Sequence, residues 1–196
     1  MKLKRVFDVA ASAWGLAVLS PVLLAMAAAV KLSSPGPALF GQVRVGKGGR
    51  PFTLYKFRSM RAGSDGMKIT SSGDGRVTGV GRFLRKTKLD EIPELFNVLR
   101  GDMSFVGPRP EVPEYVERYR PEWRRVLDVR PGITDPATIR FRNEESILAE
   151  AEDKDAYYVD AILPEKLGLN LEYLEHAGFT SDLAVVFRTL AAIVVR

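Results

Sequence analysis

The sequence contains no cysteine and only one histidine, His176, among its 196 residues. Without cysteine the protein has no disulfide framework, no thiolate nucleophile and no zinc site built on sulfur. A single histidine also excludes a histidine-rich metal centre. Any metal bound by this protein must therefore be held by carboxylates.

Length and charge narrow the class of protein further. A chain of 196 residues is long enough for one domain with a sizeable core and too short to favour two, so we expect a single domain over residues 1–196. The formal net charge of +5 favours polyanionic partners such as nucleic acid, anionic lipid or a phosphorylated substrate. The sign of the charge alone does not choose among them.

No charged residue occurs between Asp8 and Lys31. As a helix this run of about 22 residues would be about 33 Å long, enough to cross a bilayer core. It fits a signal peptide, a spanning helix or a helix that enters the membrane and turns back. Basic residues flank both ends, and the positive-inside rule therefore pulls both ends toward the cytoplasm. A straight span satisfies only one end.

A bend is expected in the middle of this run, at Ser20-Pro21. Pro21 lacks an N–H group and crowds the carbonyl of Ala17, while the Ser20 hydroxyl is able to bond back toward Leu16. A bent helix would return both ends to one face. A harmless kink in a spanning helix explains the same residues equally well, so the residues alone leave both structures open.

Two strand-like runs, Ala38–Val45 and Phe52–Arg58, predict a β-hairpin with a glycine-rich turn. The turn glycines have an ordinary steric role, which we favour over phosphate binding. The polar stretch from 62 to 81 is expected to be an exposed loop that can close over a substrate.

Two adjacent carboxylates, Asp90 and Glu91, are expected at the start of a helix that ends at Arg100-Gly101. Thr87 or Asp90 would cap this helix, and Pro93 fits only in its first turn. The ordinary explanation for acids at this position is that they complement the helix dipole.

The basic residues around the acid pair favour a catalytic role instead. Arg85 and Lys88 precede the pair, and Arg109 follows it between two prolines. A carboxylate attacks phosphorus only where the negative charge of the phosphate is neutralised, so arginines and a divalent metal are suitable companions. Neighbouring helical residues project about 100° apart. One acid could therefore attack while the other holds Mg²⁺.

Four motifs stand in a recognisable order: "KRVFDVAASAWGLAVLSPVLLAMAAAVKL", "LYKFRSM", "LDEIPELFNVLRGDMSFVGPRP" and "VRPGIT". In order and spacing they resemble those of the bacterial sugar transferases, the monotopic polyprenyl-phosphate phosphoglycosyl transferases. The resemblance covers nearly the whole chain and is to the small form that consists of the catalytic domain alone.

The resemblance implies a UDP-sugar as donor and a polyprenyl phosphate, usually undecaprenyl phosphate, as acceptor. In this family the aspartate of the Asp-Glu pair attacks the β-phosphate of the donor, releases UMP and forms a phospho-sugar ester that the lipid phosphate then attacks. Carried over, Asp90 is the nucleophile, and Glu91 together with Asp90 binds Mg²⁺. Arg85 and Arg109 match family arginines that we assign to phosphate binding.

Two further phosphate-binding candidates are Lys56, in "LYKFRSM", and Arg130, in "VRPGIT". Ser20-Pro21 matches the helix-breaking pair of the family, which implies a re-entrant helix over residues 1–35. The catalytic part, 36–196, would then lie on the cytoplasmic face of the bacterial inner membrane.

The expected fold is a helix-rich α/β monotopic membrane protein with a re-entrant helix, a small hairpin and surrounding amphipathic helices. The segment "EVPEYVERYRPEWRRVL" fits an interfacial helix and a solvated one about equally. The segment "TSDLAVVFRTLAAIVVR" predicts a helix that is buried or embedded at the interface. The expected partners include membrane lipids and exclude nucleic acid, and a homodimer is considered.

After "VRPGIT" the chain departs from the Gly-Trp-Ala-Gln type of sequence that many relatives carry, and reads Asp135-Pro136-Ala137-Thr138. We expect this region to influence which sugar is accepted.

Two functions other than sugar-phosphate transfer are also considered. One is a non-catalytic, membrane-anchored scaffold or lipid-binding relative; the other is a nucleic-acid binder, for which no recognition motif is found.

Overall fold

The computed structural model describes residues 2–61, 63 and 73–194, and these form two compact units. Within the described residues helices predominate and the strands form two-stranded sheets, which confirms the helix-rich α/β class. The first unit comprises Met1–Val43, Thr53–Gly66 and Asp74–Met103, and the second comprises Arg44–Phe52, Met67–Gly73 and Ser104–Arg196.

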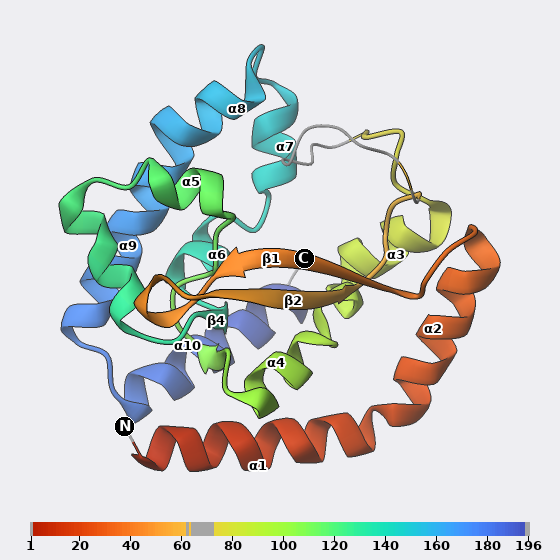
Figure 1. Cartoon of the computed structure of the whole chain (residues 1–196), viewed down its shortest axis with the longest axis horizontal. Coiled ribbons are helices and arrows are strands. Elements are labelled where there is room, and N and C mark those ends of the chain that lie inside the picture. The colour runs from red at the N-terminus through yellow and green to blue at the C-terminus, as the bar shows by residue number, and fades with distance from the viewer. Residues whose placement is uncertain (1, 62, 64–72, 195–196) are drawn as a thin grey trace. The chain divides into compact units, whose positions relative to one another are not determined.

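Two helices open the first unit: α1 (Lys2–Val18) and α2 (Ser20–Ser33), bent by 62° from one another (Figure 1). The bend has the predicted cause, because Pro21 has no N–H group to offer the carbonyl of Ala17. The Ser20 hydroxyl donates to that carbonyl at 2.7 Å. The expectation that Ser20 reaches Leu16 is therefore wrong, since the vacated acceptor lies three residues back.

The polarity of α1 is the reverse of that of a helix on a water-soluble protein. Asp8 and Ser12 are 3% and 0% exposed, whereas Leu3, Val6 and Trp14 are 64%, 65% and 70% exposed. Among the described residues no single helix is long and apolar enough to cross a bilayer, but α1 and α2 together meet that requirement as a bent pair. The outward face of α1 is thus apolar.

Arg5 attaches the first turn of α1 to the end of α4 (Glu94–Arg100). Its guanidinium donates to the carbonyl of Val98 at 2.6 Å and to that of Leu99 at 2.9 Å. These carbonyls belong to the last turn of α4, where intrahelical partners run out and a positive charge complements the helix dipole. Gly101 ends α4 with a φ of 96°, as predicted, in the left-handed region that favours glycine.

A second arginine, Arg58, holds the carboxyl end of α2. It is 6% exposed and donates to the carbonyls of Pro35 at 2.6 Å, Ser34 at 2.7 Å and Val30 at 3.4 Å. One side chain therefore satisfies the carbonyl groups where the helix ends. The buried hydrophobic residues beside it are Val30, Phe57 and Leu84.

The predicted hairpin is confirmed to within one residue at each strand end. It consists of β1 (Leu39–Val45) and β2 (Pro51–Phe57), joined through the short 3₁₀ element η1 (Lys47–Gly49). Gly48 and Gly49 have φ values of 69° and 74°. The turn therefore requires residues without a Cβ atom, which is the steric role expected for these glycines.

The side-chain amide of Asn97 joins β2 to α4. Its nitrogen donates to the carbonyl of Thr53 at 2.7 Å, and its oxygen accepts from the backbone nitrogen of Tyr55 at 3.1 Å. Asn97 is 0% exposed. The amide thus pairs with the edge of β2 as a neighbouring strand would. Lys56, the next residue of β2, is held beside α4 as a result.

The helix predicted from about residue 90 to residue 100 begins later than expected. The structure has α3 (Gly79–Thr87), a 3₁₀ turn η2 (Leu89–Glu91) and then α4, with Pro93 immediately before its first residue. Thr87 caps nothing, because its hydroxyl donates back to Phe83 at 2.8 Å. Lys88, with a φ of 60°, ends α3, and the missing N–H group of Pro93 separates η2 from α4.

The predicted loop from 62 to 81 can be compared with the structure only in part. Residues 62 and 64–72 lie outside the described part of the chain. Its last residues already belong to α3, because the Thr78 hydroxyl accepts from the backbone nitrogen of Gly81 at 2.9 Å and caps this helix.

The second unit contains one parallel strand pair and a set of short helices. β3 and β4 pair in the register Ser104↔Gly132 and Val106↔Thr134. The elements after α4 are β3 (Ser104–Val106), α5 (Pro113–Glu117), η3 (Pro121–Asp128), β4 (Gly132–Thr134), α6 (Pro136–Arg140), α7 (Glu144–Ala149), α8 (Lys154–Tyr157), the π-helical η4 (Tyr158–Ile162), α9 (Leu163–Glu175) and α10 (Phe179–Val194).

The core of this unit contains aromatic residues that the sequence analysis considered for the membrane interface. Tyr115 and Tyr119 are 5% and 6% exposed and pack with Val126 and Leu163. The segment is also not one interfacial helix, because each proline starts a new element, α5 and then η3. The predicted carboxyl-terminal helix is confirmed as α10, but it is not buried throughout, because Phe187 and Leu190 are 68% and 54% exposed; its embedding at the interface stays a prediction.

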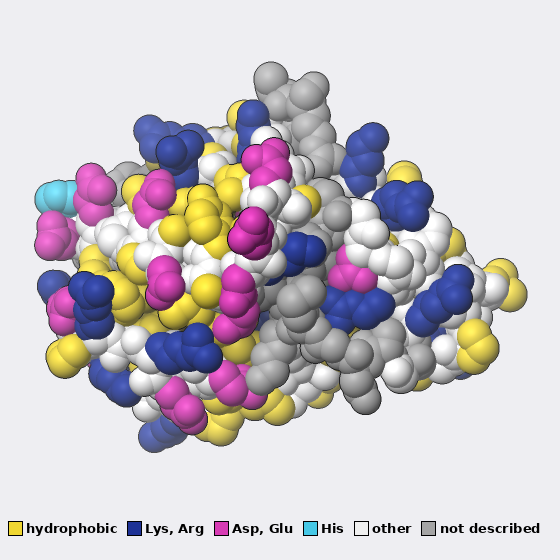
Figure 2. Space-filling model, turned by 90° about the horizontal axis from the view of Figure 1, so that it is seen from above, with side chains coloured by type: hydrophobic (Ala, Val, Ile, Leu, Met, Phe, Trp, Pro, Cys, Tyr) yellow, Lys and Arg dark blue, Asp and Glu magenta, His cyan; other side chains and the backbone are white. Residues whose placement is uncertain are grey.

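Acidic and basic side chains are mixed on the surface that Figure 2 shows, where Asp and Glu lie among Lys and Arg. On this face the net positive charge of the chain is therefore not gathered into one uniform patch.

Asn97→Ala should lower the free energy of unfolding by about 2 kcal/mol, because two buried backbone groups of β2 lose their partner. Chemical denaturation measures this difference. The control is Asn143→Ala at an exposed position, which should change stability by less than about 0.5 kcal/mol. Equal effects of the two substitutions would contradict the bridging role of Asn97.

Candidate active site

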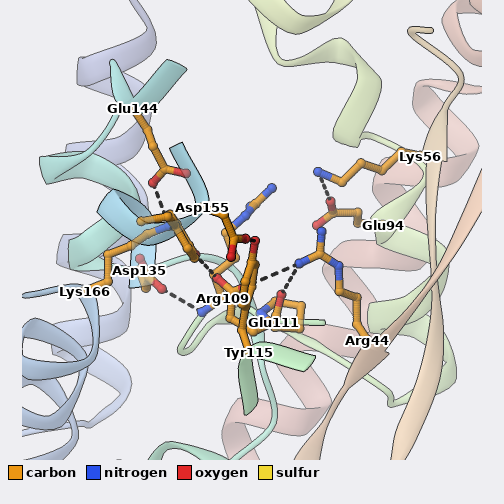
Figure 3. Close-up of polar contacts among 12 residues, drawn as sticks. Arg44, Lys56, Glu94, Arg109, Glu111, Tyr115, Asp135, Glu144, Asp155 and Lys166 are labelled. Atoms are coloured by element: carbon orange, nitrogen blue, oxygen red, sulfur yellow. Dashed lines mark hydrogen bonds and ion pairs between the residues drawn. The ribbon is translucent and has the colours of Figure 1, made fainter. Parts of the chain in front are cut away.

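Lys56 lies between two carboxylates at the start of α4. Its ammonium nitrogen is 2.8 Å from Glu91 Oε1 and 3.3 Å from Glu94 Oε1 (Figure 3 draws the contact with Glu94). Glu94 is 1% exposed. A buried carboxylate requires a partner, and Lys56 supplies one positive charge to both acids.

Asp90 is the buried member of the acid pair, at 6% exposed, and its Oδ1 atom has no hydrogen-bond partner among the described residues. Burial raises the pKa of Asp90 above its usual value, and the charge of the adjacent Glu91 raises it further. The positive charges of Lys56, Arg85 and Lys88 oppose this rise. The result is a carboxylate that is poorly solvated and surrounded by cations.

Arg85 comes from the last turn of α3 and contributes positive charge to the surroundings of Asp90. Its guanidinium lies 3.4 Å from the Ser59 hydroxyl. A Cβ atom at Gly81 would lie 1.9 Å from the carbonyl oxygen of Ser59, so only glycine allows α3 to approach the "LYKFRSM" segment this closely. This close approach explains how Arg85 comes to share the site with Lys56.

Arg109 and Arg130 belong to the second unit, where their backbone segments touch. A Cβ atom at Gly107 would lie 2.5 Å from the carbonyl oxygen of Arg130, and the backbone nitrogen of Gly132 donates to the carbonyl of Pro108 at 3.1 Å. The turn that carries Arg109 therefore packs directly on the turn that carries Arg130.

A family model described as bacterial sugar transferase matches residues 1–196. The chain belongs to the bacterial sugar transferase family. The resemblance seen in its four motifs is thereby confirmed.

Named relatives of this sugar transferase act on UDP-sugars and undecaprenyl phosphate. It is 40% identical over 195 residues to the UDP-glucose:undecaprenyl-phosphate glucose-1-phosphate transferase of Caulobacter vibrioides, covering 97% of this chain and 69% of that protein. It is 38% identical over 198 residues to the UDP-N-acetylgalactosamine-undecaprenyl-phosphate N-acetylgalactosaminephosphotransferase of Aeromonas hydrophila, covering 97% and 43% respectively.

A third relative is the UDP-glucose:undecaprenyl-phosphate glucose-1-phosphate transferase of Escherichia coli, which is 40% identical over 194 residues, covering 96% of this chain and 39% of that protein. The chain thus spans less than half of the length of the second and third relatives.

The predicted site residues of this sugar transferase fall into two groups. Lys56, Arg85, Asp90 and Glu91 are brought together within the first unit. The backbone segments of Arg109 and Arg130 are brought together within the second unit. Their roles in phosphate binding stay predictions, as does the nucleophilic role of Asp90.

The acid pair is compatible with Mg²⁺. Within the described residues no cluster of three or more His, Cys, Asp or Glu side chains is positioned to hold a metal. Mg²⁺ commonly takes only one or two protein carboxylates and completes its coordination with water and substrate phosphates. The buried Oδ1 of Asp90, which has no hydrogen-bond partner among the described residues, is an oxygen ligand of the required type.

Sequence reasoning missed Glu94 and Asn97, which position Lys56, and Arg58, which holds α2. Glu94 follows Glu91 by three residues and therefore lies on the same face of a helical segment, which was an available signal. No local pattern identifies Asn97, because its partners in β2 lie 42 and 44 residues away.

Asp90→Asn should raise the thermal stability of the protein at neutral pH. Folding raises the pKa of this carboxyl group, so the protonated group favours the folded state. This contribution to stability is complete below the pKa of the unfolded chain, near 3.8, and it is lost as the pH rises through the pKa of the folded protein. Removing the charge should therefore stabilise by about 1 kcal/mol at pH 7.5. The gain should shrink toward pH 4.

Thermal unfolding at several pH values measures this gain, with Asp128→Asn at an exposed carboxylate as the control. A lower melting temperature for Asp90→Asn at pH 7.5 would show that the ionised carboxylate is stabilised by its cationic neighbours instead.

Proposed function

We propose that this protein transfers a sugar 1-phosphate from a UDP-sugar to a polyprenyl phosphate, most simply undecaprenyl phosphate, and releases UMP. The observation that carries the proposal is the buried carboxylate of Asp90, which has an oxygen without a hydrogen-bond partner among the described residues and lies among three cations. The names of the relatives support the donor and acceptor classes.

In the first step, an oxygen of Asp90 attacks the β-phosphorus of the donor. A bond forms between this oxygen and phosphorus, and the bond from phosphorus to the bridging oxygen breaks, so that UMP leaves with the electron pair. Lys56 and Arg85 provide positive charge where negative charge develops on the phosphoryl oxygens. Weak solvation keeps the ionised Asp90 reactive, as suits a nucleophile.

In the second step, a phosphate oxygen of the polyprenyl phosphate attacks the phosphorus of the phospho-sugar ester. The bond between Asp90 and phosphorus breaks, the carboxylate is restored and polyprenyl diphosphate-sugar is released. Asp90 and Glu91 would hold Mg²⁺, which when bound neutralises charge on the donor diphosphate.

Lys56 has a second part in this scheme because it already neutralises Glu91. Glu91, which would help to hold Mg²⁺, has its Oε1 atom 2.8 Å from the ammonium nitrogen of Lys56. Glu94 offers Lys56 an alternative partner at 3.3 Å. Lys56 would therefore keep a buried carboxylate partner if Glu91 were to hold the metal.

We further propose that α1 and α2 form a re-entrant membrane helix whose two ends lie on the cytoplasmic face. Arg5 in the first turn of α1 and Ser34 at the end of α2 are both hydrogen-bonded to the same folded unit, through α4 and through Arg58. A straight span would separate those ends by the thickness of the bilayer. The apolar outward face of α1 supports burial in lipid.

Incubation with UDP-glucose or UDP-N-acetylgalactosamine and Mg²⁺, without lipid acceptor, should increase the intact mass of the protein by one sugar phosphate. Asp90→Asn should show no increase, whereas Asp128→Asn, at an exposed carboxylate, should behave like the wild type. Lipid-linked sugar formed without any adduct would indicate direct transfer, with Asp90 as a general base.

The absence of cysteine makes the membrane topology directly testable. Single substitutions Leu3→Cys and Ser33→Cys should both react with an impermeant maleimide in inverted membrane vesicles and not in intact spheroplasts. Asp128→Cys marks the side of the catalytic part, and Val18→Cys near the bend should react poorly on both sides. Reaction of Leu3→Cys and Ser33→Cys from opposite sides would establish a straight span.

A further inference from the structure

We infer that Asp135 is a positioning residue for Arg109 and thereby sets the affinity of the protein for the diphosphate of its donor. The inference rests on the proposed function and on the expectation, implied by the family resemblance, that Arg109 binds a phosphate group of the donor. Asp135 belongs to the region that is expected to influence which sugar is accepted. The contacts of its carboxylate support a different role.

The carboxylate of Asp135 is fully buried and accepts three hydrogen bonds. Its Oδ2 atom accepts from the backbone nitrogen of Arg109 at 2.7 Å (Figure 3). The same oxygen accepts from the side-chain amide of Asn170 at 3.1 Å. Its Oδ1 atom accepts from the backbone nitrogen of Thr138, at the start of α6. One side chain thus links the Arg109 turn, α6 and α9.

The Pro108-Arg109-Pro110 turn is held through its carbonyls, since Pro108 accepts from the backbone nitrogen of Gly132 at 3.1 Å and Pro110 accepts from Arg44 at 3.0 Å, and through the single bond from the Arg109 nitrogen to Asp135. The two prolines have no N–H group, so Arg109 supplies the only backbone donor of these three residues. The prolines also restrict the backbone dihedrals of the turn. The bond to Asp135 is therefore the one that fixes the backbone of Arg109 itself, and it works together with the bond from the Arg109 guanidinium to the carbonyl of Ile133 at 3.3 Å to position this side chain.

Helix capping alone does not explain a fully buried carboxylate at this position. Asp153 caps α8 in the same way, by accepting from the backbone nitrogen of Ala156 at 3.0 Å, and it is exposed to solvent. Burying an ionised carboxylate is costly unless charge-assisted bonds offset the cost. The additional bonds of Asp135 are those to Arg109 and Asn170.

This role makes a prediction that differs from direct sugar recognition. The diphosphate is common to all UDP-sugars, so displacement of Arg109 should lower the binding affinity for every donor by the same factor. The affinity for UDP alone, which has the diphosphate and no sugar, should fall by that factor too. A residue that selects the sugar would change the ratio between donors and leave UDP binding unaffected.

The experiment is a double-mutant cycle between Asp135→Ser and Arg109→Ala, read by the calorimetric affinity for UDP. Serine still caps a helix but is too short to reach Arg109 as well. Asp135→Ser should weaken UDP binding by about tenfold in the wild-type background and should have no further effect once Arg109 is alanine. Asp153→Ser, the matched cap control, should leave UDP binding unchanged.

Unchanged UDP affinity in Asp135→Ser would overturn the inference, as would an equal loss in both Arg109 backgrounds, since that is the additive result of a purely structural effect. If Asp135→Ser fails to fold, Asp135→Asn enters the same cycle with the side-chain volume kept. Turnover of UDP-sugar with undecaprenyl phosphate is measured separately. A wild type that binds UDP but makes no lipid-linked sugar would count against the proposed function, while the cycle still decides the role of Asp135.

Discussion

The amide of Asn97 is the interaction on which the arrangement of the first unit depends. It pairs with the edge of β2 from the middle of α4, and so places Lys56 against the amino end of this helix. The carboxyl end of the same helix accepts the guanidinium of Arg5. One short helix therefore has the acid cluster at one end and the attachment of α1 at the other. The acid cluster and the packing of α1 therefore both depend on the position of α4.

The acid cluster combines groups that do not stabilise one another well. Asp90 and Glu91 are adjacent, so their negative charges repel one another, and burial makes the charged form of Asp90 still less favourable. Lys56 offsets part of it by pairing with Glu91 and Glu94. Such a carboxylate is a poor structural element, and its weak solvation suits the nucleophilic role proposed for Asp90.

Attachment of α1 and α2 to the protein follows a simple electrostatic rule. Arginine contacts the carboxyl end of a helix in both cases: Arg5 at the end of α4 and Arg58 at the end of α2. The exposed carbonyl groups at a helix end require donors, and a guanidinium supplies several in one plane. The apolar surface of α1 is left facing outward as a consequence.

Local patterns predicted the features that depend on local chemistry. Proline and serine at the bend, glycine in the hairpin turn and Gly101 at the end of α4 all act through backbone dihedrals or hydrogen bonds within a few residues. The three-residue strands β3 and β4 were not predicted, because so short a segment has no readable alternation. The start of α4 was misplaced because an acid pair suits a 3₁₀ turn as well as a first helical turn.

The sequence by itself determined the family, the bend at Ser20-Pro21, the hairpin and the identity of the acid pair. Only the tertiary structure decided which partners the charged side chains meet. Lys56 and Glu91 are 35 residues apart in the chain, and Arg109 and Asp135 are 26 apart. The first contact depends on how β2 packs on α4 within the first unit, and the second on how β3 pairs with β4 within the second unit; no local pattern specifies either arrangement.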